Sequence, residues 1–222
     1  TFFLSKSTNF DNLSDALHTF EDITGSVIKK SKTKGLRLNN APTPTTSFNI
    51  KWSNDEGIKI LGITFFTDYT HSLNFNWSQA IEKLKTQINE TKSRRLSFRG
   101  KILNLNTIAL ANFWYVGTVF PFPPWLNKTT FSIIFAYIWN EKFEHIKRET
   151  IFLPKSEGGL GLSHPTLKSI ALRLKIIPFV VIKNTPKWAT IARYYLAFTL
   201  GGLNDEWIHL RSNLIPKPDR NI

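Results

Sequence analysis

Apolar residues recur at helical spacing near the start of the chain. One helical face carries Phe10, Leu13, Leu17, Phe20 and Ile23. This pattern predicts a helix over 9–24, with Gly25 suited to its C-terminal cap.

Shorter apolar runs around this helix predict strands. We expect strands at 1–5, 26–28 and 33–38 and a Pro/Thr-rich loop at 39–47. A strand–turn–strand pattern follows over 52–66, with its turn at 54–57. Its second strand, Ile58–Phe65, has Gly62 in the middle. A mid-strand glycine lets another backbone approach closely or marks a bulge, and an ordinary core strand is the simpler interpretation.

From Trp77 onward the spacing becomes helical. Three helices are expected, and they carry the apolar sets Ile81/Leu84/Ile88, then Ile102/Leu105/Ile108/Ala109/Phe113, then the aromatic run Thr129–Trp139. Arg99-Gly100 should separate or kink the first two, and Pro121–Pro124 should stop the second. A brief strand at 151–153, a glycine turn at 157–162 and a helix from Ser163 or Pro165 to Leu174 complete the pattern.

These elements predict an α+β fold in three parts. Residues 1–76 combine strands with a helix, 77–183 are mainly helical, and 184–222 form an irregular tail interrupted by Pro and Gly pairs. We expect the sheet of the first part to need more strands than these residues supply. The chain also has no Met and opens on Thr1 inside an apolar run. We therefore interpret the chain as part of a longer polypeptide.

Positive charge is concentrated in the helical part. The formal net charge is +13, and residues 77–183 hold 16 Lys/Arg against 6 Asp/Glu, a net charge of +10. An excess of this size is typical of proteins that bind polyanions, nucleic acid first and acidic membranes second. The uncharged stretch 102–127 contains Asn104, Asn106 and Asn112 and a proline cluster, so a buried helix with a proline loop is favoured over a membrane span.

A basic cluster within this block is the main candidate site. It consists of Lys83, Lys85, Lys92, Arg94, Arg95, Arg99 and Lys101. These side chains could neutralise phosphates, or they could form a solvated helix face. The basic turn around Lys29–Lys34 has the same two interpretations, with a charged surface loop favoured.

The residues give little support for a metal site, a catalytic centre or a phosphate-binding loop. The absence of Cys excludes disulfides and zinc–thiolate sites. The five His show no ligand spacing, no nucleophile–base set can be defended, and no carboxylate pair lies in a strand–turn context that fits a two-metal site. The glycine run 158–161 lacks the spacing of a phosphate-binding loop, so a tight turn is expected.

An ordered set of segments resembles the reverse transcriptase of LINE-type (non-long-terminal-repeat) retrotransposons. The segments are 1–5, 20–28 with Lys32-Thr33, 58–65, Asn76-Trp77, 95–103, Trp139-Asn140 with Lys147-Arg148, 157–162 and 171–174. The match spans roughly residues 1–175, which is most of the chain. Ile28-Lys29 departs from the usual Ile-Asn of the family.

The resemblance implies the end of an antiparallel reverse-transcriptase palm in 1–76 and a helical thumb and connecting region in 77–183. It implies that Leu61, Gly62 and Ile63 form a primer grip, that Lys32 lies near the leaving pyrophosphate, and that the basic cluster grips the template–primer duplex. The partners would be an RNA template, an RNA–DNA or DNA primer duplex and the rest of the palm, with no membrane. The location would be the nucleus and cytoplasm.

The resemblance also bears on catalysis. In the family the metal-binding aspartates lie in motifs N-terminal to the segment matched at Thr1. We therefore expect Mg²⁺ to serve the full-length RNA-directed DNA polymerase and no cofactor to be bound by this chain.

Two alternatives stay open. The chain could be a non-catalytic basic RNA-binding module from a truncated or decayed element. It could also be a structural or interaction protein whose aromatic helices, 113–115 and 131–139, form an oligomer face, although a core role for these aromatic residues is favoured.

Overall fold

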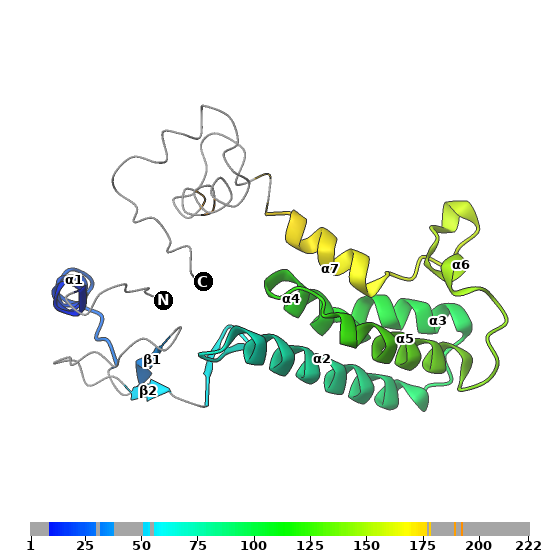
Figure 1. Cartoon of the computed structure of the whole chain (residues 1–222), viewed down its shortest axis with the longest axis horizontal. Helices are drawn as coiled ribbons and strands as arrows, with labels where there is room; N and C mark the ends of the chain where they lie inside the picture. Colours follow the sequence, from blue (N-terminus) through cyan, green and yellow to red (C-terminus); the bar gives the residue numbers. More distant parts are fainter. Residues whose placement is uncertain are drawn as a thin grey trace. The chain divides into compact units, whose positions relative to one another are not determined.

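The computed structural model of the chain (Figure 1) describes residues 9–29, 32–37, 51–53 and 56–176, together with residues 178, 189 and 192. The strand expected at 1–5 and the loop expected at 39–47 lie outside the described residues. So does the tail 184–222, except for Ala189 and Ala192. The chain divides into two compact units, an N-terminal unit (Thr1–Leu96) and a C-terminal unit (Ser97–Ile222).

The N-terminal unit combines two helices with short strands. Its described elements are α1 (Asn9–Thr24), β1 (Lys34–Leu36), β2 (Lys51–Ser53), β3 (Ile58–Ile60), β4 (Ile63–Phe65) and α2 (Tyr69–Lys92). With the helices of the C-terminal unit, these elements confirm the α+β class at the level of mixed helices and small sheets. A reverse-transcriptase palm remains a prediction.

Helix α1 has the bounds that its apolar spacing predicts. Gly25 ends it with a left-handed φ of +65°, and the amide of Gly25 donates to the carbonyl of Glu21 at 2.9 Å. A glycine adopts this conformation without the steric cost that a Cβ would bring. The strand expected at 26–28 is wrong: this segment is irregular, and the amide of Ile28 donates to a carboxylate oxygen of Glu21 at 2.6 Å.

The strands form two separate pairs. β1 and β2 pair in parallel, with Lys34 opposite Lys51. β3 and β4 pair antiparallel, with Ile58 opposite Phe65 and Ile60 opposite Ile63. The resemblance implied antiparallel strands, and only the second pair has that direction. β1 also contacts β3, so both pairs belong to the same unit.

The continuous strand expected over 58–65 is wrong. The segment is a tight hairpin in which Leu61 and Gly62 form a two-residue turn with φ values of +48° and +89°. Positive φ at both turn positions is typical of the type I′ turn, whose twist matches that of antiparallel strands. Gly62 is therefore a turn residue and not a mid-strand glycine.

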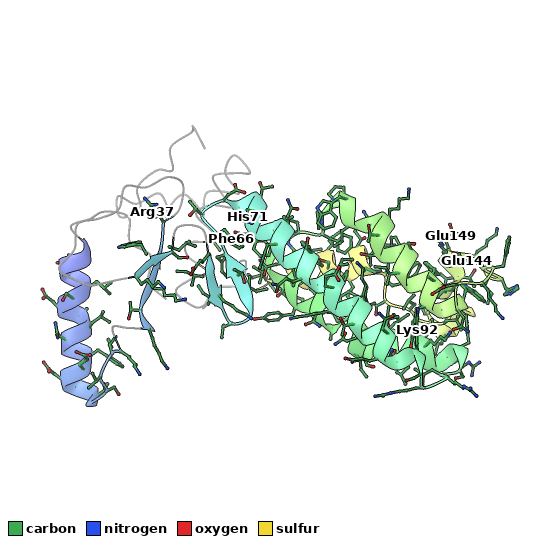
Figure 2. The ribbon with its side chains drawn as sticks, turned by 90° about the horizontal axis from the view of Figure 1, so that it is seen from below. Arg37, Phe66, His71, Lys92, Glu144 and Glu149 are labelled. Carbon is green, nitrogen blue, oxygen red and sulfur yellow. The ribbon has the colours of Figure 1, made fainter. Side chains whose placement is uncertain are left out.

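Helix α2 begins earlier than its hydrophobic spacing indicated. Asp68 caps its N-terminus by accepting a hydrogen bond from the amide of His71 at 2.5 Å, so the helix starts at Tyr69. The ring of His71 stacks on Phe66, with centroids 4.0 Å apart, just after the hairpin (Figure 2). The expected part boundary at 76/77 falls inside α2, and the division between the two units lies at Leu96/Ser97.

The C-terminal unit is helical in its described part. Its elements are α3 (Phe98–Asn104), the π-helical turn η2 (Leu105–Ala109), α4 (Ala111–Val119), α5 (Pro124–Trp139), α6 (Arg148–Phe152), the 3₁₀ turn η3 (Lys155–Glu157) and α7 (Pro165–Leu174). Ser97 caps α3, so the break from α2 lies before Phe98 and not at Arg99-Gly100. The strand expected at 151–153 is wrong, because Ile151 lies in α6.

A wide turn interrupts the helix that was expected to run from 102 to 113. The amide of Leu110 reaches back to the carbonyl of Leu105 at 3.0 Å, which widens the turn locally. Leu105, Ala109 and Leu110 are fully buried. Pro124 starts α5 as its first helical residue, a position where the missing amide hydrogen costs nothing.

Helix α7 packs on α4 through two small residues (Figure 1). A Cβ built on Gly117 would lie 2.6 Å from the hydroxyl oxygen of Ser169, so no larger residue fits without a shift. The N-cap of α7 is His164 rather than Ser163: its Nδ1 accepts from the amide of Leu167 at 3.4 Å. Burial lowers the pKa of His164, which favours the neutral ring that can accept this bond.

The glycine segment before α7 is a tight turn, as predicted. A Cβ on Gly159 would lie 2.1 Å from the carbonyl oxygen of Leu153, so only glycine fits there. Asn106 closes this turn from η2: its amide donates to the carbonyl of Gly161 and accepts from the amide of Ser163, both at 2.8 Å. The turn therefore has a structural explanation in the packing of the unit.

Candidate nucleic-acid interface

The hairpin β3–β4 carries the three residues expected to form the primer grip. Leu61 is 88% exposed at the tip, and Gly62 beside it is also exposed. Ile63 is the first residue of β4 and is buried. The hairpin therefore presents Leu61 and the backbone of Gly62 to solvent, while Ile63 helps hold the hairpin in place.

Two polar side chains of α2 fix the hairpin to the helix. Asn76 accepts from the amide of Thr64 at 3.0 Å and donates to the carbonyl of Thr64 at 2.7 Å, so it pairs with β4 as another strand would. One turn earlier, the hydroxyl of Ser72 accepts from the amide of Phe66 at 2.8 Å. Both side chains are buried, which makes these bonds costly to lose.

Gly57 lets the chain pass close to the end of the hairpin. It has a φ of +65°, and a Cβ there would lie 2.8 Å from the carbonyl oxygen of Phe65 and 2.9 Å from the ring of Phe66. Ser53 donates to the carbonyl of Gly57 at 3.0 Å. With the contacts from α2, these interactions hold the base of the hairpin rigidly while its tip stays exposed.

Lys32 lies in the basic turn before β1. Its side chain is exposed, and its amide donates to the carbonyl of Lys29 at 2.9 Å. Lys29 and Lys34 are exposed as well. The arrangement fits both a charged surface turn and a phosphate-binding one, so the role that the resemblance implies for Lys32 stays a prediction.

The N-terminal part of the basic cluster lies along α2 and directly after it. Lys83, Lys85 and Lys92 are exposed, and the seven-residue spacing puts Lys85 and Lys92 on one helical face. Lys85 is paired with Glu82 at 2.7 Å, so this charge is partly offset. Figure 2 marks Lys92 in the last turn of the helix.

Arg94 and Arg95 follow the C-cap of α2 and are exposed. Cations near a helix C-terminus are stabilised by the carbonyl groups left without partners there. Arg95 has a left-handed φ of +44°, which turns the chain out of the helix. These arginines therefore have a structural role in ending α2, and the same exposure leaves their guanidinium groups accessible to phosphates.

The C-terminal part of the cluster, Arg99 and Lys101, lies in α3 of the other unit. Arg99 is exposed, whereas Lys101 is only 7% exposed. The ammonium of Lys101 donates to the carbonyls of Tyr137 and Ile138 and to the side chain of Asn140. Lys101 thus caps the C-terminus of α5, and its assignment to nucleic-acid binding is wrong because its donors are already used.

Burial has a consequence for the charge of Lys101. Desolvation lowers its pKa, since an ammonium loses the water that stabilises it. The carbonyl oxygens at the end of α5 replace that water as acceptors. The sequence could not reveal this role, because the acceptors lie 36 and 37 residues further along the chain.

The aromatic helices are mainly core elements. Phe113, Phe135 and Tyr137 are buried, as favoured from the sequence. Tyr115, in contrast, is 46% exposed. An oligomer face made of both aromatic segments would therefore lack these three buried side chains.

Two interactions in the C-terminal unit had no clear signal in the sequence. Lys168 lies over the ring of Trp114 at 4.2 Å, and burial followed by the nearby charge of Lys175 lowers its pKa. Arg148 pairs with Glu144 through two hydrogen bonds and lies over the ring of Phe135. The Glu144–Arg148 spacing alone suggests a helical pair, but Glu144 lies in the loop before α6 and Arg148 is the first residue of that helix.

Within the described residues, no three His, Asp or Glu side chains gather in a way that could hold a metal ion. None of the helices that the structure describes combines the length and apolar character needed to cross a membrane. No protein-family model, curated protein or solved structure matches the chain. Its function must therefore be inferred from its own residues.

Proposed function

We propose that the chain is part of the RNA-directed DNA polymerase of a LINE-type retrotransposon, in which it positions the primer and grips the template–primer duplex. The observation that carries the proposal is the ordered series of segments that resembles this family. The hairpin with its exposed tip and the basic residues of α2 follow one another in the order that a primer grip and a thumb would require.

The geometry of the N-terminal unit supports this proposal. A primer terminus needs a rigid element that approaches it through backbone and small groups, and the hairpin offers a glycine at an exposed tip above a base fixed by Asn76 and Ser72. A duplex needs cations that contact its phosphates without reading bases. Lys83, Lys92, Arg94 and Arg95 of this unit are exposed, and so is Arg99 in α3 of the C-terminal unit.

In this function the chain contributes binding and positioning. Mg²⁺ would be held by carboxylates of the complete polymerase palm, and its role would be to stabilise the charge that develops during phosphoryl transfer. Lys32 would lie on the pyrophosphate side. Lys101 takes no part in binding, because it holds the end of α5.

The test is the salt dependence of binding to an RNA–DNA hybrid. Replacing Arg94, Arg95 and Arg99 together by Ala should reduce the slope of log K against log salt by up to about one unit per lost contact. A matched variant removes the same charge elsewhere, through Lys142→Ala, Arg173→Ala and Lys175→Ala, at positions that are also exposed. Equal slopes for the two triple variants would contradict the proposed grip.

Preference among nucleic acids separates the proposal from its main alternative. A template–primer grip should favour a duplex with a recessed primer end over single-stranded RNA of the same length. A general RNA-binding module would bind by charge alone and show no preference for the primer end. A lack of retention on either nucleic acid, together with a mass above that of the monomer at high salt, would instead favour an interaction protein.

A further inference from the structure

The parallel pairing of β1 with β2 brings two lysines together (Figure 1). Lys34 and Lys51 are the first residues of these strands and lie directly opposite each other, although they are far apart in the sequence. Both side chains are exposed. Neighbouring strands lie about 4.8 Å apart, and residues in register on a parallel pair share one face of the sheet. We call Lys34 and Lys51 the lysine pair.

Two like charges in this arrangement are unfavourable unless an anion offsets them. Like charges directly opposite each other on neighbouring strands destabilise a sheet. Among the described residues, neither Lys34 nor Lys51 has a carboxylate within ion-pair distance. The repulsion within the lysine pair is therefore not offset by the part of the chain that the structure describes.

The sequence around the lysine pair also carries charge of one sign. Residues 1–76 hold eight Lys/Arg and seven Asp/Glu, a net charge of only +1. That sum conceals the stretch 23–54, which contains six cations and no Asp or Glu. A local excess of this kind raises the concentration of anions near the surface. The six cations are Lys29, Lys30, Lys32, Lys34, Arg37 and Lys51.

We propose that the lysine pair is a phosphate-binding site, at which Lys34 and Lys51 together hold one phosphate group of a nucleic-acid backbone. A charge-assisted bond from an ammonium to a phosphate oxygen is about 2.8 Å long, and a phosphate has several such oxygens. Two ammonium groups on strands about 4.8 Å apart can therefore bond different oxygens of the same phosphate. The bound anion replaces the repulsion within the pair by two attractions.

This site is separate from the surfaces used in the proposed function. It lies in β1 and β2 of the N-terminal unit, and it uses neither the hairpin tip nor the basic residues of α2. It also does not depend on the role of Lys32. A nucleic-acid backbone and a free nucleotide share the chemistry of the phosphate group, so the tests must separate these two sources.

A charge-swap cycle tests whether the two lysines face each other. At low salt, Lys51→Glu in the full chain should raise the melting temperature by about 1–3 °C, because a repulsion becomes an attraction. Adding Lys34→Glu should remove this gain, since two carboxylates then face each other. The control starts from Lys142→Glu, at an exposed position in the C-terminal unit, where adding Lys34→Glu should still give a gain. Additive effects of Lys34→Glu and Lys51→Glu would overturn the proposal.

The salt dependence of binding to an RNA–DNA hybrid tests the occupant. Replacing Lys34 and Lys51 together by Ala should reduce the slope of log K against log salt by about one unit, because one phosphate is no longer neutralised. Lys142→Ala with Lys175→Ala removes the same charge from exposed positions and should leave the slope unchanged. Lys51→Glu should also bind the hybrid more weakly although it is more stable than the wild type, which excludes unfolding as the cause.

Inorganic triphosphate separates the two sources of phosphate. If it raises the melting temperature of the wild type more than that of the Lys34→Ala, Lys51→Ala variant, while both bind the hybrid with equal slopes, the pair holds a free nucleotide. The assignment to a nucleic-acid backbone is then overturned. If neither triphosphate nor the hybrid distinguishes the two proteins, the phosphate site itself is overturned.

The proposed function can fail without this inference failing. The Arg94, Arg95 and Arg99 triple variant leaves the lysine pair intact. A reduced slope in the Lys34→Ala, Lys51→Ala variant with an unchanged slope in the triple variant would support the lysine pair and contradict the proposed grip. The reverse result would support the grip and overturn the binding of a nucleic-acid backbone at the lysine pair.

Discussion

The side chain of Asn76 pairs with the backbone of Thr64 through both of its polar atoms, at 3.0 Å and 2.7 Å. A helix side chain thereby takes the place of a neighbouring strand for one residue of β4. The hairpin that carries the candidate primer grip is consequently fixed to α2. The position of Leu61 and Gly62 therefore depends on the bonds between Asn76 and Thr64.

Replacing Asn76 by Leu should lower the free energy of unfolding by about 2–4 kcal/mol, because the substitution removes the partner of the half-buried amide and carbonyl of Thr64. Urea unfolding measures the change. Gln79→Leu on the exposed side of the same helix is the control and should change stability by less than about 0.5 kcal/mol. Similar losses in both variants would contradict the pairing.

Replacing Leu61 by Asn should stabilise the hairpin. Leu61 has a φ of +48° and is 88% exposed, so a residue that tolerates the left-handed region gains backbone stability and loses little burial. We expect a gain of about 0.5–1 kcal/mol in unfolding free energy. Thr64→Asn, in a strand of the same hairpin, should be destabilising. A loss of stability in Leu61→Asn would contradict the type I′ turn.

Replacing Lys101 by Met should lower the free energy of unfolding by about 2–3 kcal/mol, because the terminal carbonyls of α5 lose a charged donor. Arg99→Met removes the same charge from an exposed position in the same helix and should have little effect on stability. Nucleic-acid binding should show the opposite pattern: Arg99→Met should weaken it, and Lys101→Met should leave it unchanged. Weakened binding by Lys101→Met in a variant that remains folded would restore Lys101 to the binding surface.

Because Gly117 and Ser169 are in contact, the loss of stability caused by Gly117→Ala should shrink or become a gain when Ser169 is replaced by Ala. Ser169→Ala alone should be close to neutral, because the Ser169 hydroxyl has no hydrogen-bond partner among the described residues. Gly117→Ala should be destabilising in the wild-type background, since the added methyl group meets that hydroxyl. In the Ser169→Ala background the same change should cost less or become favourable, as alanine gains up to about 1 kcal/mol in helix propensity. Additive effects would show that the two residues are not in contact.

Local patterns predicted the helices well because apolar spacing and caps lie close together in the sequence. The bounds of α1 follow from one apolar face and Gly25. The start of α2 was missed because Leu73, Phe75 and Trp77 alternate with polar residues, a spacing typical of a strand and not of a helix. The hairpin was missed because Leu61 occupies a turn position where Asn or Gly is the usual signal.

The candidate site could be predicted only in part, for a physical reason. Composition locates a basic block, but it cannot tell an exposed cation from one that is used in the fold. Lys101 and Arg99 are alike in sequence context, and only the return of α5 to α3 separates their roles. The hydrogen bonds from Asn76 to β4 could likewise not be predicted, because nothing in the sequence indicates which backbone groups the side-chain amide of Asn76 will bond.

The most direct test of the proposed function is cross-linking of the hairpin tip to a primer end. Leu61→Cys supplies the only thiol in the chain, and a DNA primer annealed to an RNA template carries a thiol-reactive group on its 3′-terminal nucleotide. Thr19→Cys in α1 is the control, and a second duplex carries the reactive group at an internal nucleotide. We predict that the thiol of the Leu61→Cys variant cross-links efficiently to the primer end only. Equal cross-linking to the internal position, or equal cross-linking by the Thr19→Cys control, would contradict a primer grip at this hairpin.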